Sequence, residues 1–505
     1  MNTSRTINSV KNAGVNLLAR LTGQICAFIL RTIFLRYLGA QYTGISTLFT
    51  DILHILSFTE LGMGTAISYA FYKPVSENDE YRIAQLMKLC RYLYGFISAS
   101  VLVLGMCLLP FLDMLVRDVP NIKESISYIY ILYVLKTSLS YLLVYKSTLL
   151  IANQKQYIVT ACEAAVAVIK TGVEVILLIF FGNFMFYLYV EVVSTIATNL
   201  LISFFARRKD PSRRIQVKLP KNDFKDLFKN IKATFIYKVN GIILNSTDSL
   251  IISSSINTAA VAYMSNYNLL FNAVSTITFQ IISAMTASVG NFAISKSGQE
   301  QKHIFCTINF LCYIFTGIAV TGLWLCSGYF VEIIFGPRYV LSDSIVILLA
   351  MNLFMINMHQ VVDMFRTANG IFQKGKMRPL VTAIINLVVS LVAVRYLGLF
   401  GVVLGTVVSR LTTQVWYDSK LIFNIVFQES AWHYYRVYCI YSGLTIVICF
   451  CGACLLNALP FSVYGLFAVG FFYAIFANML VVILFFRKTN EFESALGYLR
   501  GLLKR

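Results

Sequence analysis

Charged side chains lie inside long apolar stretches of this 505-residue chain. A charge in the middle of a bilayer costs roughly 2.5–3.5 kcal/mol on insertion scales, so such residues usually face a partner or a water-filled cavity. Arg20 and Arg31 are eleven residues apart in the first stretch and share one helix face with Asn16. Two stacked guanidinium groups suit an anionic ligand in a cavity. The alternative is that each arginine pairs with an acid such as Asp51 or Glu60.

A second group of charges has the spacing of pairs within one helix. Glu163, Lys170 and Glu174 recur at i, i+7 and i+11, which places a Lys–Glu pair at i, i+4. This spacing favours a structural pairing at least as much as a ligand site. One face of a later stretch carries His359, Asp363, Arg366 and Gly370. There Asp363 and Arg366 can neutralise each other.

Uncharged polar side chains are concentrated in the stretch 260–294. Amides and phenols of this kind are what sugar hydroxyls or a water-filled path require, although the same groups can also join helices. The stretch contains Tyr263, Asn266, Tyr267, Asn268, Asn272, Gln280 and Asn291. The residues predicted to line a polar cavity are Asn16, Asn245, Asn272 and Gln280.

The elements that carry these residues are those of a membrane protein. Apolar residues make up 58% of the chain and charged residues only 13%, whereas soluble proteins carry about 25% charged residues. The net charge of +19 is spread between apolar runs, as expected for cytoplasmic loops beside anionic lipid headgroups, so nucleic acid is not a predicted partner. Most of the eleven cysteines lie in apolar runs and act as small hydrophobic residues. No disulfide framework, metal site or cofactor is predicted.

A helix needs about 20 residues to span the hydrocarbon core of a bilayer. Fourteen stretches of sufficient length are 13–38, 43–70, 86–116, 126–150, 159–181, 184–206, 234–256, 260–294, 304–335, 345–370, 379–397, 400–426, 438–458 and 463–486. Lys and Arg are concentrated in alternate connections and in the tail, which predicts that both termini are cytoplasmic. The predicted fold is an all-α integral membrane protein.

Short hairpins recur along the chain, with Arg-Tyr-Leu-Gly at 36–39 and again at 395–398. They predict two pseudo-symmetric six-helix bundles, over 1–206 and 234–426. A basic cytoplasmic loop with an amphipathic helix (apolar at 224, 227, 228 and 231) joins them over 207–233. Two extra transmembrane helices and an amphipathic cytoplasmic tail follow over 427–505, with Asn490 and Glu493 as the expected capping pair of the tail helix.

Several catalytic motifs are absent from the sequence. There is no GxxxxGK[ST], so the chain is not an ATP-driven pump by itself, and no HExxH or Ser/His/Asp grouping stands out. The predicted outer loops are too short to hold a folded domain. An enzyme would therefore have to do its chemistry inside the membrane, and we expect a transporter instead.

Short motifs of low individual specificity, distributed along most of the chain, carry a family resemblance. They are LGAQYTG (38–44), FTELGMG (58–64), TASVGN (286–291), RTANG (366–370) and YLGLFGVVLGT (396–406). In this order and spacing they make the sequence resemble the polysaccharide transporters, the Wzx-type lipid-linked oligosaccharide flippases. These belong to the multidrug/oligosaccharidyl-lipid/polysaccharide exporter superfamily, and the likeness is greatest to members that handle capsule or exopolysaccharide units.

The resemblance implies two bundles around a cationic cavity that opens alternately to each side. The implied cargo is an undecaprenyl-diphosphate-linked oligosaccharide, moved from the inner to the outer leaflet of a bacterial plasma membrane. Arg20 and Arg31 would hold its diphosphate, since guanidinium pairs bidentately with phosphate. The other implied cavity cations are Lys238, Arg366 and Arg410. The acids left open as the ion-coupling site are Asp51, Glu60, Asp248 and Asp363.

The implied partners are the lipid-linked substrate, membrane lipids, and the polymerase and glycosyltransferase machinery. One rival within the same fold is a multidrug exporter, whose typically cationic cargo a cavity of Arg and Lys would repel. Another is a membrane-embedded polysaccharide polymerase or ligase, for which the outer loops are short. Cations such as Lys136 outnumber their obvious partners, which favours a carrier for an anionic lipid headgroup.

Overall fold

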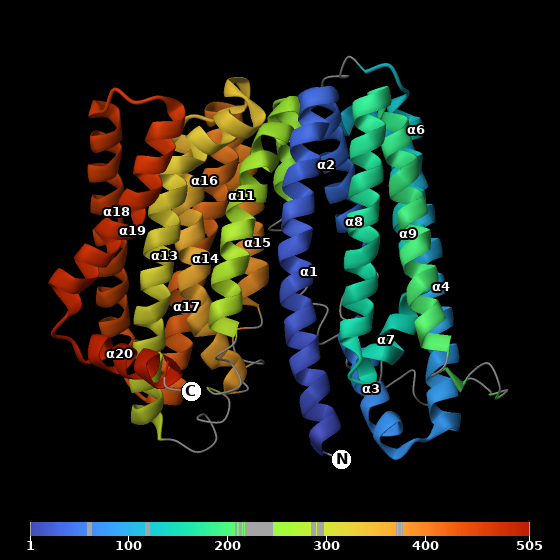
Figure 1. Cartoon of the computed structure of the whole chain (residues 1–505), viewed down its shortest axis with the longest axis horizontal. Helices are drawn as coiled ribbons and strands as arrows, with labels where there is room; N and C mark the ends of the chain where they lie inside the picture. Colours follow the sequence, from blue (N-terminus) through green and yellow to red (C-terminus); the bar gives the residue numbers. More distant parts are fainter. Residues whose placement is uncertain are drawn as a thin grey trace. The chain divides into compact units, whose positions relative to one another are not determined.

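The computed structural model is helical throughout the part of the chain that it describes. It describes residues 2–57, 63–116, 122–207, 210–211, 215, 217, 246–283, 289, 297–369, 371, 375 and 377–503. These residues form long helices joined by short turns and contain no β-strand (Figure 1). The predicted all-α membrane fold is therefore confirmed.

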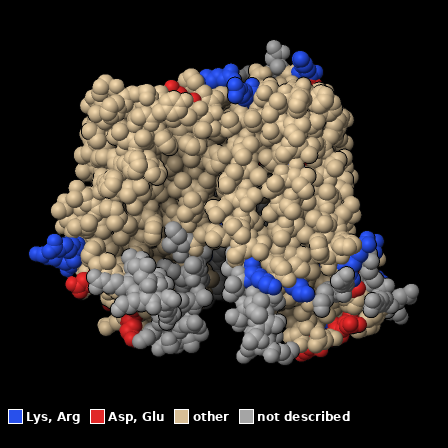
Figure 2. Space-filling view, viewed as in Figure 1, with Lys and Arg blue, Asp and Glu red and all other residues tan. Residues whose placement is uncertain are grey.

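Eleven helices in this part of the chain are long and apolar enough to cross a membrane. They coincide with eleven of the fourteen predicted stretches. The other three predicted stretches, 43–70, 234–256 and 260–294, each include residues outside the described ranges. On the face drawn in Figure 2, charged side chains gather at the ends of the helices and leave an uncharged band between them. This is the distribution that lipid contact requires, and the protein is a multi-pass membrane protein.

The chain divides into two compact units, of which the first is Met1–Ala262. The helices of its described residues are α1 (Asn2–Tyr37), α2 (Gly39–Leu56), α3 (Met63–Glu77), α4 (Glu80–Cys107), α5 (Leu112–Leu115), α6 (Ile126–Tyr141), α7 (Val144–Ala152), α8 (Gln156–Phe181), α9 (Phe184–Ala206) and a helical segment over 246–255. α1 packs along α8, α8 packs on α9, and both α4 and α9 pack on α6. Phe49, Tyr130 and Phe184 are fully buried where α2, α6 and α9 meet.

The second unit is Tyr263–Arg505. Its helices are α11 (Thr258–Ser283), which begins just before the boundary, α13 (Gly298–Phe335), α14 (Asp343–Ala368), α15 (Arg378–Leu397), α16 (Leu399–Thr412), α17 (Gln414–Ile422), α18 (Trp432–Ala458), α19 (Val463–Phe486) and α20 (Asn490–Leu503). α13 contacts α14, α18, α19 and α20, and α15 and α16 form a tight hairpin. The predicted division at 207–233 and at 427 remains a prediction.

Two predicted single spans are broken helices. The stretch 126–150 is interrupted at Leu142 and Leu143, between α6 and α7, and the stretch 400–426 is interrupted at Thr413, between α16 and α17. At the first break, the Asn199 amide of α9 donates to the carbonyls of Leu139 (3.0 Å) and Ser140 (3.2 Å). The break is tolerated in a membrane because a neighbouring helix satisfies these backbone groups.

Helix ends also differ from prediction where capping residues act. α13 begins six residues before the predicted start at 304, because Ser297 and Glu300 form a capping box. The tail helix α20 begins at Asn490, as expected, but the Thr489 hydroxyl accepts from the Phe492 amide (3.4 Å) in place of the predicted cap. Phe492 packs on Phe310 of α13. The amphipathic helix predicted within 207–233 lies outside the described residues.

Candidate functional site

The first unit contains a charged cluster between α6, α8 and α9, which we call the lysine–glutamate cluster: Lys136, Lys170, Glu174 and Glu191. The carboxylate of Glu191 lies 2.6 Å from Lys136 Nζ and 2.7 Å from Lys170 Nζ. Lys170 Nζ also lies 3.9 Å from Glu174 one turn along α8, which confirms the predicted i, i+4 pair. Tyr187 donates its hydroxyl to Glu191 (3.2 Å).

Burial differs between the acids and the bases of this cluster. The side chain of Glu174 is 0% exposed and that of Glu191 is 8% exposed, whereas Lys136 and Lys170 are 31% and 23% exposed. Each ammonium carries three N–H donors, more than its ion pairs use. The cluster therefore presents its positive groups outward and encloses its negative groups, an arrangement able to accept an anion.

Glu191 is the residue of this cluster that the sequence analysis did not single out. It is the single charged residue of the stretch 184–206, a signal that could have identified it. Lys136, one of the cations predicted to outnumber their obvious partners, pairs at 2.6 Å with Glu191 of a helix distant in sequence. The predicted excess of unpartnered cations is reduced accordingly.

The predicted residues of α1 lie along its contact with α8. Asn16 accepts a hydrogen bond from Thr160 of α8 (2.8 Å), so it joins the two helices. Arg20 is exposed, whereas Arg31 is half-buried near the phenols of Tyr187 and Tyr133 beside the lysine–glutamate cluster. The two arginines thus have different surroundings on one helix.

The predicted acids of the first unit lie on α2 and on the helical residues 246–255. Asp51 hydrogen-bonds with Ser249. Asp248, the residue before Ser249 in the chain, is half-buried. The predicted residues Glu60, Lys238 and Asn245 lie outside the described residues.

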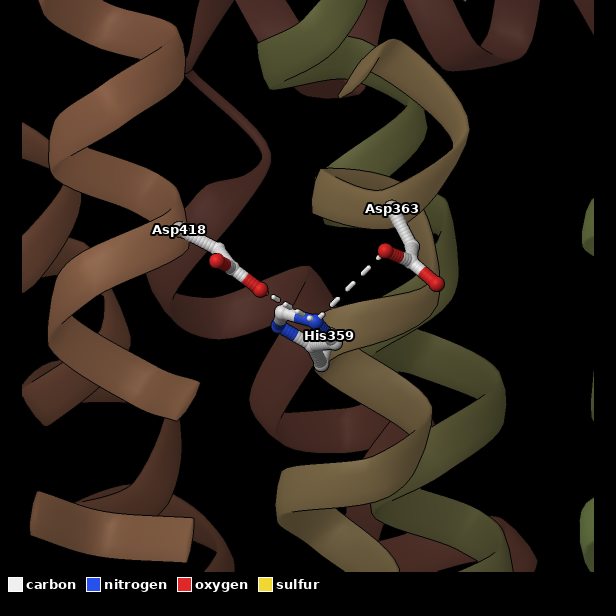
Figure 3. Close-up of side chains that lie close together, drawn as sticks. All are labelled: His359, Asp363 and Asp418. Atoms are coloured by element: carbon white, nitrogen blue, oxygen red, sulfur yellow. Dashed lines mark ion pairs between the residues drawn. The ribbon is translucent and has the colours of Figure 1, made fainter. Parts of the chain in front are cut away.

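The second unit contains another charged cluster, which we call the Asp418 cluster: His359, Asp363, Arg366, Arg378 and Asp418. His359 Nε2 on α14 lies 3.2 Å from Asp418 on α17 and 3.9 Å from Asp363 one turn along α14, as Figure 3 shows. Arg366 lies 3.1 Å from Asp363 and 3.5 Å from Asp418. Arg378, the first residue of α15, donates to both oxygens of Asp418.

Asp418 and Arg378 were not singled out from the sequence, and they change the interpretation of Arg366. Asp363 and Arg366 do pair, as their spacing suggested, but Arg366 also contacts Asp418, so it is not an isolated cavity cation. Ligand atoms of His359, Asp363 and Asp418 lie within 4.8 Å of one another, close enough for a metal ion. Two guanidinium groups already neutralise the two carboxylates, however, so the charge balance favours an ion-pair network over a divalent cation.

In the Asp418 cluster the most exposed side chain is an acid, whereas in the lysine–glutamate cluster the lysines are more exposed than the acids. Asp363 is 51% exposed, whereas the side chains of His359, Arg366 and Arg378 are 8–9% exposed and Asp418 is 0% exposed. This cluster therefore presents a carboxylate.

The remaining predicted residues of the second unit lie on α16 and α11. Arg410 on α16 donates to Gln414 (2.9 Å). Asn272 on α11 is exposed, and Gln280 two turns later is half-buried.

Solved structures share this fold. The chain aligns with an inward-closed structure of the lipid II flippase MurJ over 95% of its own length and 99% of the other chain, with a TM-score of 0.67 and 14% identity. It aligns with an inward-facing multidrug resistance MATE family transporter of the MOP superfamily over 80% and 97%, with a TM-score of 0.60 and 14% identity. A Vibrio cholerae MATE transporter, VcmN, gives coverage of 85% and 100%, a TM-score of 0.54 and 12% identity.

These similarities cover 80–95% of the chain and show that it shares the fold of these transporters. No family model matches the sequence, and no curated protein matches it. At 14% identity the fold alone is shared, so the cargo must be argued from the charged clusters.

Proposed function

We propose that this protein is an alternating-access transporter that flips a lipid-linked oligosaccharide, anchored by undecaprenyl diphosphate, from the inner to the outer leaflet of a bacterial plasma membrane. It would act between the glycosyltransferases that build the unit and the polymerase that consumes it. The observation that carries the proposal is the outward positive face of the lysine–glutamate cluster, whose acids are 0% and 8% exposed while its lysines are 23% and 31% exposed.

The chemistry of a diphosphate fits this face. Charge-assisted hydrogen bonds from ammonium and guanidinium groups to phosphate oxygens are about twice as strong as neutral ones. α1, which carries Arg20 and Arg31, packs along α8, which carries Lys170. Four basic side chains on three helices of one unit thereby supply donors for a multivalent anion, and a cationic cargo would be repelled by them.

The Asp418 cluster supplies a place for ion coupling. Asp363 is exposed, and its buried neighbour Arg366 contacts both Asp363 and Asp418. Protonation of Asp363, or cation binding to it, would weaken the pair between Asp363 and Arg366. Arg366 would then pair with Asp418 only. Such a change between two pairings is a local switch that a proton or ion gradient can bias.

A multidrug exporter is the second candidate, and one observation favours it. The exposed carboxylate of Asp363 could bind a cationic drug directly, and transporters described as MATE proteins share the fold. The two candidates place the charged side chains that bind the cargo in different units. Variants of Lys136 and Asp363 therefore separate them.

The experiment compares two cargoes in proteoliposomes that contain the full chain. Lys136→Gln removes one partly exposed cation and leaves the Lys170–Glu191 pair in place. It should lower flipping of a fluorescent undecaprenyl-diphosphate glycan by roughly tenfold or more, because one charge-assisted hydrogen bond contributes about 1.5–3 kcal/mol. Lys136→Arg should retain most of the activity.

Lys302→Gln is the matched control, since Lys302 is also paired and partly exposed but lies in a peripheral pair with Glu429 of the second unit. It should flip the glycan lipid as the unaltered protein does. Unchanged flipping in Lys136→Gln would overturn the assignment of the cargo site. Efflux of a cationic dye that is lost in Asp363→Asn, with no flipping of the glycan lipid, would establish the multidrug function instead.

A further inference from the structure

A large groove lies in the first unit, and its lining on α6 and α9 begins at Leu139 and Ile196, three and five residues beyond Lys136 and Glu191 of the lysine–glutamate cluster. Its volume is 1430 Å³, and it is formed by α4, α6, α7, α9 and described residues between 210 and 217. α4 and α9 both pack on α6 and on α7, so the four helices meet at the groove. None of the four residues of the lysine–glutamate cluster lines it.

The break between α6 and α7 shapes this groove. Asn199 of α9 donates to the carbonyls of Leu139 and Ser140 at the break, where the Leu142 amide also donates to Leu139 (3.3 Å). One turn further along α9, Ser203 accepts a hydrogen bond from Lys146 of α7 (2.6 Å). Two successive turns of α9 thus hold the broken helix open, with a buried lysine directly after the break.

The lining of the groove changes from basic to apolar. Among its described lining residues the basic side chains are Lys88, Arg91 and Lys146 and the one carboxylate is that of Asp210, so the formal charge of this described lining is positive. Lys88 donates to the carbonyl of Val217 (2.8 Å), another lining residue. Its exposed apolar side chains are Tyr92 (56%), Phe96 (69%), Leu142 (44%), Ile196 (39%) and Leu200 (56%).

We propose that this groove binds an anionic phospholipid of the surrounding membrane, with the phosphate at Lys88, Arg91 and Lys146. The acyl chains would lie along Tyr92, Phe96 and the exposed side chains of α9. Lys88 is the third residue of the predicted span 86–116, at the level where a helix enters the headgroup region. A soluble anion would pair with the same cations but would leave the apolar walls in contact with water.

Two features give the site selectivity for charge. Lys146 is only 9% exposed, and its hydrogen bond to Ser203 fixes its position, so the site does not depend on a freely moving surface lysine. Arg91 is exposed and carries a planar guanidinium that matches a phosphate. A zwitterionic lipid would bring a cationic choline into a positively charged groove, so an anionic lipid should bind more tightly.

The test is native mass spectrometry of the purified full chain with added dioleoyl phosphatidylglycerol or dioleoyl phosphatidylcholine. We expect the unaltered protein to bind phosphatidylglycerol at least about tenfold more tightly than phosphatidylcholine. The double variant Lys88→Gln/Arg91→Gln should lose that preference. Arg91→Lys should keep most of it, and Arg395→Gln, which removes an exposed cation from the second unit, should leave it unchanged.

A second arm distinguishes a lipid from a soluble anion. Phe96→Ala/Leu200→Ala keeps all three cations and shortens the apolar walls, so it should weaken phosphatidylglycerol binding, and glycerol phosphate at millimolar concentration should not displace the lipid. Equal binding of the two lipids by the unaltered protein would overturn the proposal. So would a retained preference in Lys88→Gln/Arg91→Gln, or displacement by glycerol phosphate. Thermal unfolding without added lipid verifies that each variant is folded.

Discussion

At the scale of single residues, Glu191 and Asp418 have the same environment. Each is a buried carboxylate held between two cations from other helices. A buried charge is tolerated only when its partners and hydrogen bonds replace its hydration, and both carboxylates meet that condition. The remaining members of each cluster then determine what it presents outward, which is ammonium in the first unit and the Asp363 carboxylate in the second.

Replacing Glu191 should destabilise the first unit. Glu191→Gln removes the carboxylate that Lys136 and Lys170 share and leaves Lys170 only its longer pair with Glu174 (3.9 Å). Breaking a buried pair costs about 3–5 kcal/mol, and we expect a value near 3 kcal/mol because both lysines keep some contact with solvent. Thermal unfolding in detergent should show a Tm lower by several degrees, and adding Lys136→Gln should restore part of it.

Glu429→Gln is the comparison for this prediction. Glu429 also pairs with a lysine, Lys302, but its side chain is 40% exposed. Exposed pairs contribute about 0–1 kcal/mol, so its Tm should hardly change. Equal Tm values for the two variants would show that the lysine–glutamate cluster is not a stabilising network.

At the scale of elements, the α15–α16 hairpin depends on glycines that let two backbones approach. Gly401 and Gly405 are four residues apart on α16. A Cβ at Gly401 would lie 2.4 Å from the carbonyl of Ala393, and one at Gly405 would lie 2.8 Å from the backbone nitrogen of Ser390. Backbone atoms cannot move aside as a flexible side chain can, and such spacing of small residues is typical of close helix pairs in membranes.

Gly405→Ala should therefore destabilise the second unit by about 1–3 kcal/mol, the usual cost of overpacking. Gly172→Ala is the matched control, because a Cβ at this exposed position in the middle of α8 would meet nothing within 4 Å. It should be neutral or slightly stabilising, since alanine favours a helix more than glycine does. The Tm of the two variants in the same detergent tests the difference, and a stable Gly405→Ala protein would contradict the packing argument.

The helices could be predicted from the sequence far better than their contacts. Apolar length predicted the spans of α8, α9, α15 and α19 to within a few residues, because a bilayer imposes that length on every helix. The break between α6 and α7 could not be predicted, since the residue that permits it, Asn199, is about sixty positions away. Local sequence carries no signal for a carbonyl that a different helix satisfies.

The same limit applied to the candidate site. Lys170–Glu174 and Asp363–Arg366 were predictable because they lie within one helix, at i, i+4 and i, i+3. Glu191 and Asp418 join helices, and spacing says nothing about which helices pack together. Asn16 was expected to line a cavity, but its hydrogen bond to Thr160 joins α1 to α8, the alternative that buried amides always leave open.

At the scale of the whole molecule, the proposed cargo site and the proposed coupling site belong to different units. A transporter that alternates between two states moves its cargo uphill only if the driving ion favours one of those states. Asp363 is the exposed acid of the Asp418 cluster, and its pair with Arg366 at 3.1 Å is the contact that ion binding would change. Cargo binding should not depend on this contact, whereas coupling should.

Asp363→Asn should therefore abolish gradient-driven flipping and leave energy-independent equilibration of the glycan lipid between leaflets. Proteoliposomes with and without an imposed proton or sodium gradient measure the two activities separately. Asp113→Asn, which removes an exposed carboxylate from α5 of the first unit, should respond to the gradient as the unaltered protein does. If Asp363→Asn kept its response to both gradients, the coupling site would have to lie among the other predicted acids, Asp51, Asp248 and Glu60. If it lost equilibration as well, Asp363 would belong to the cargo path, as the multidrug function requires.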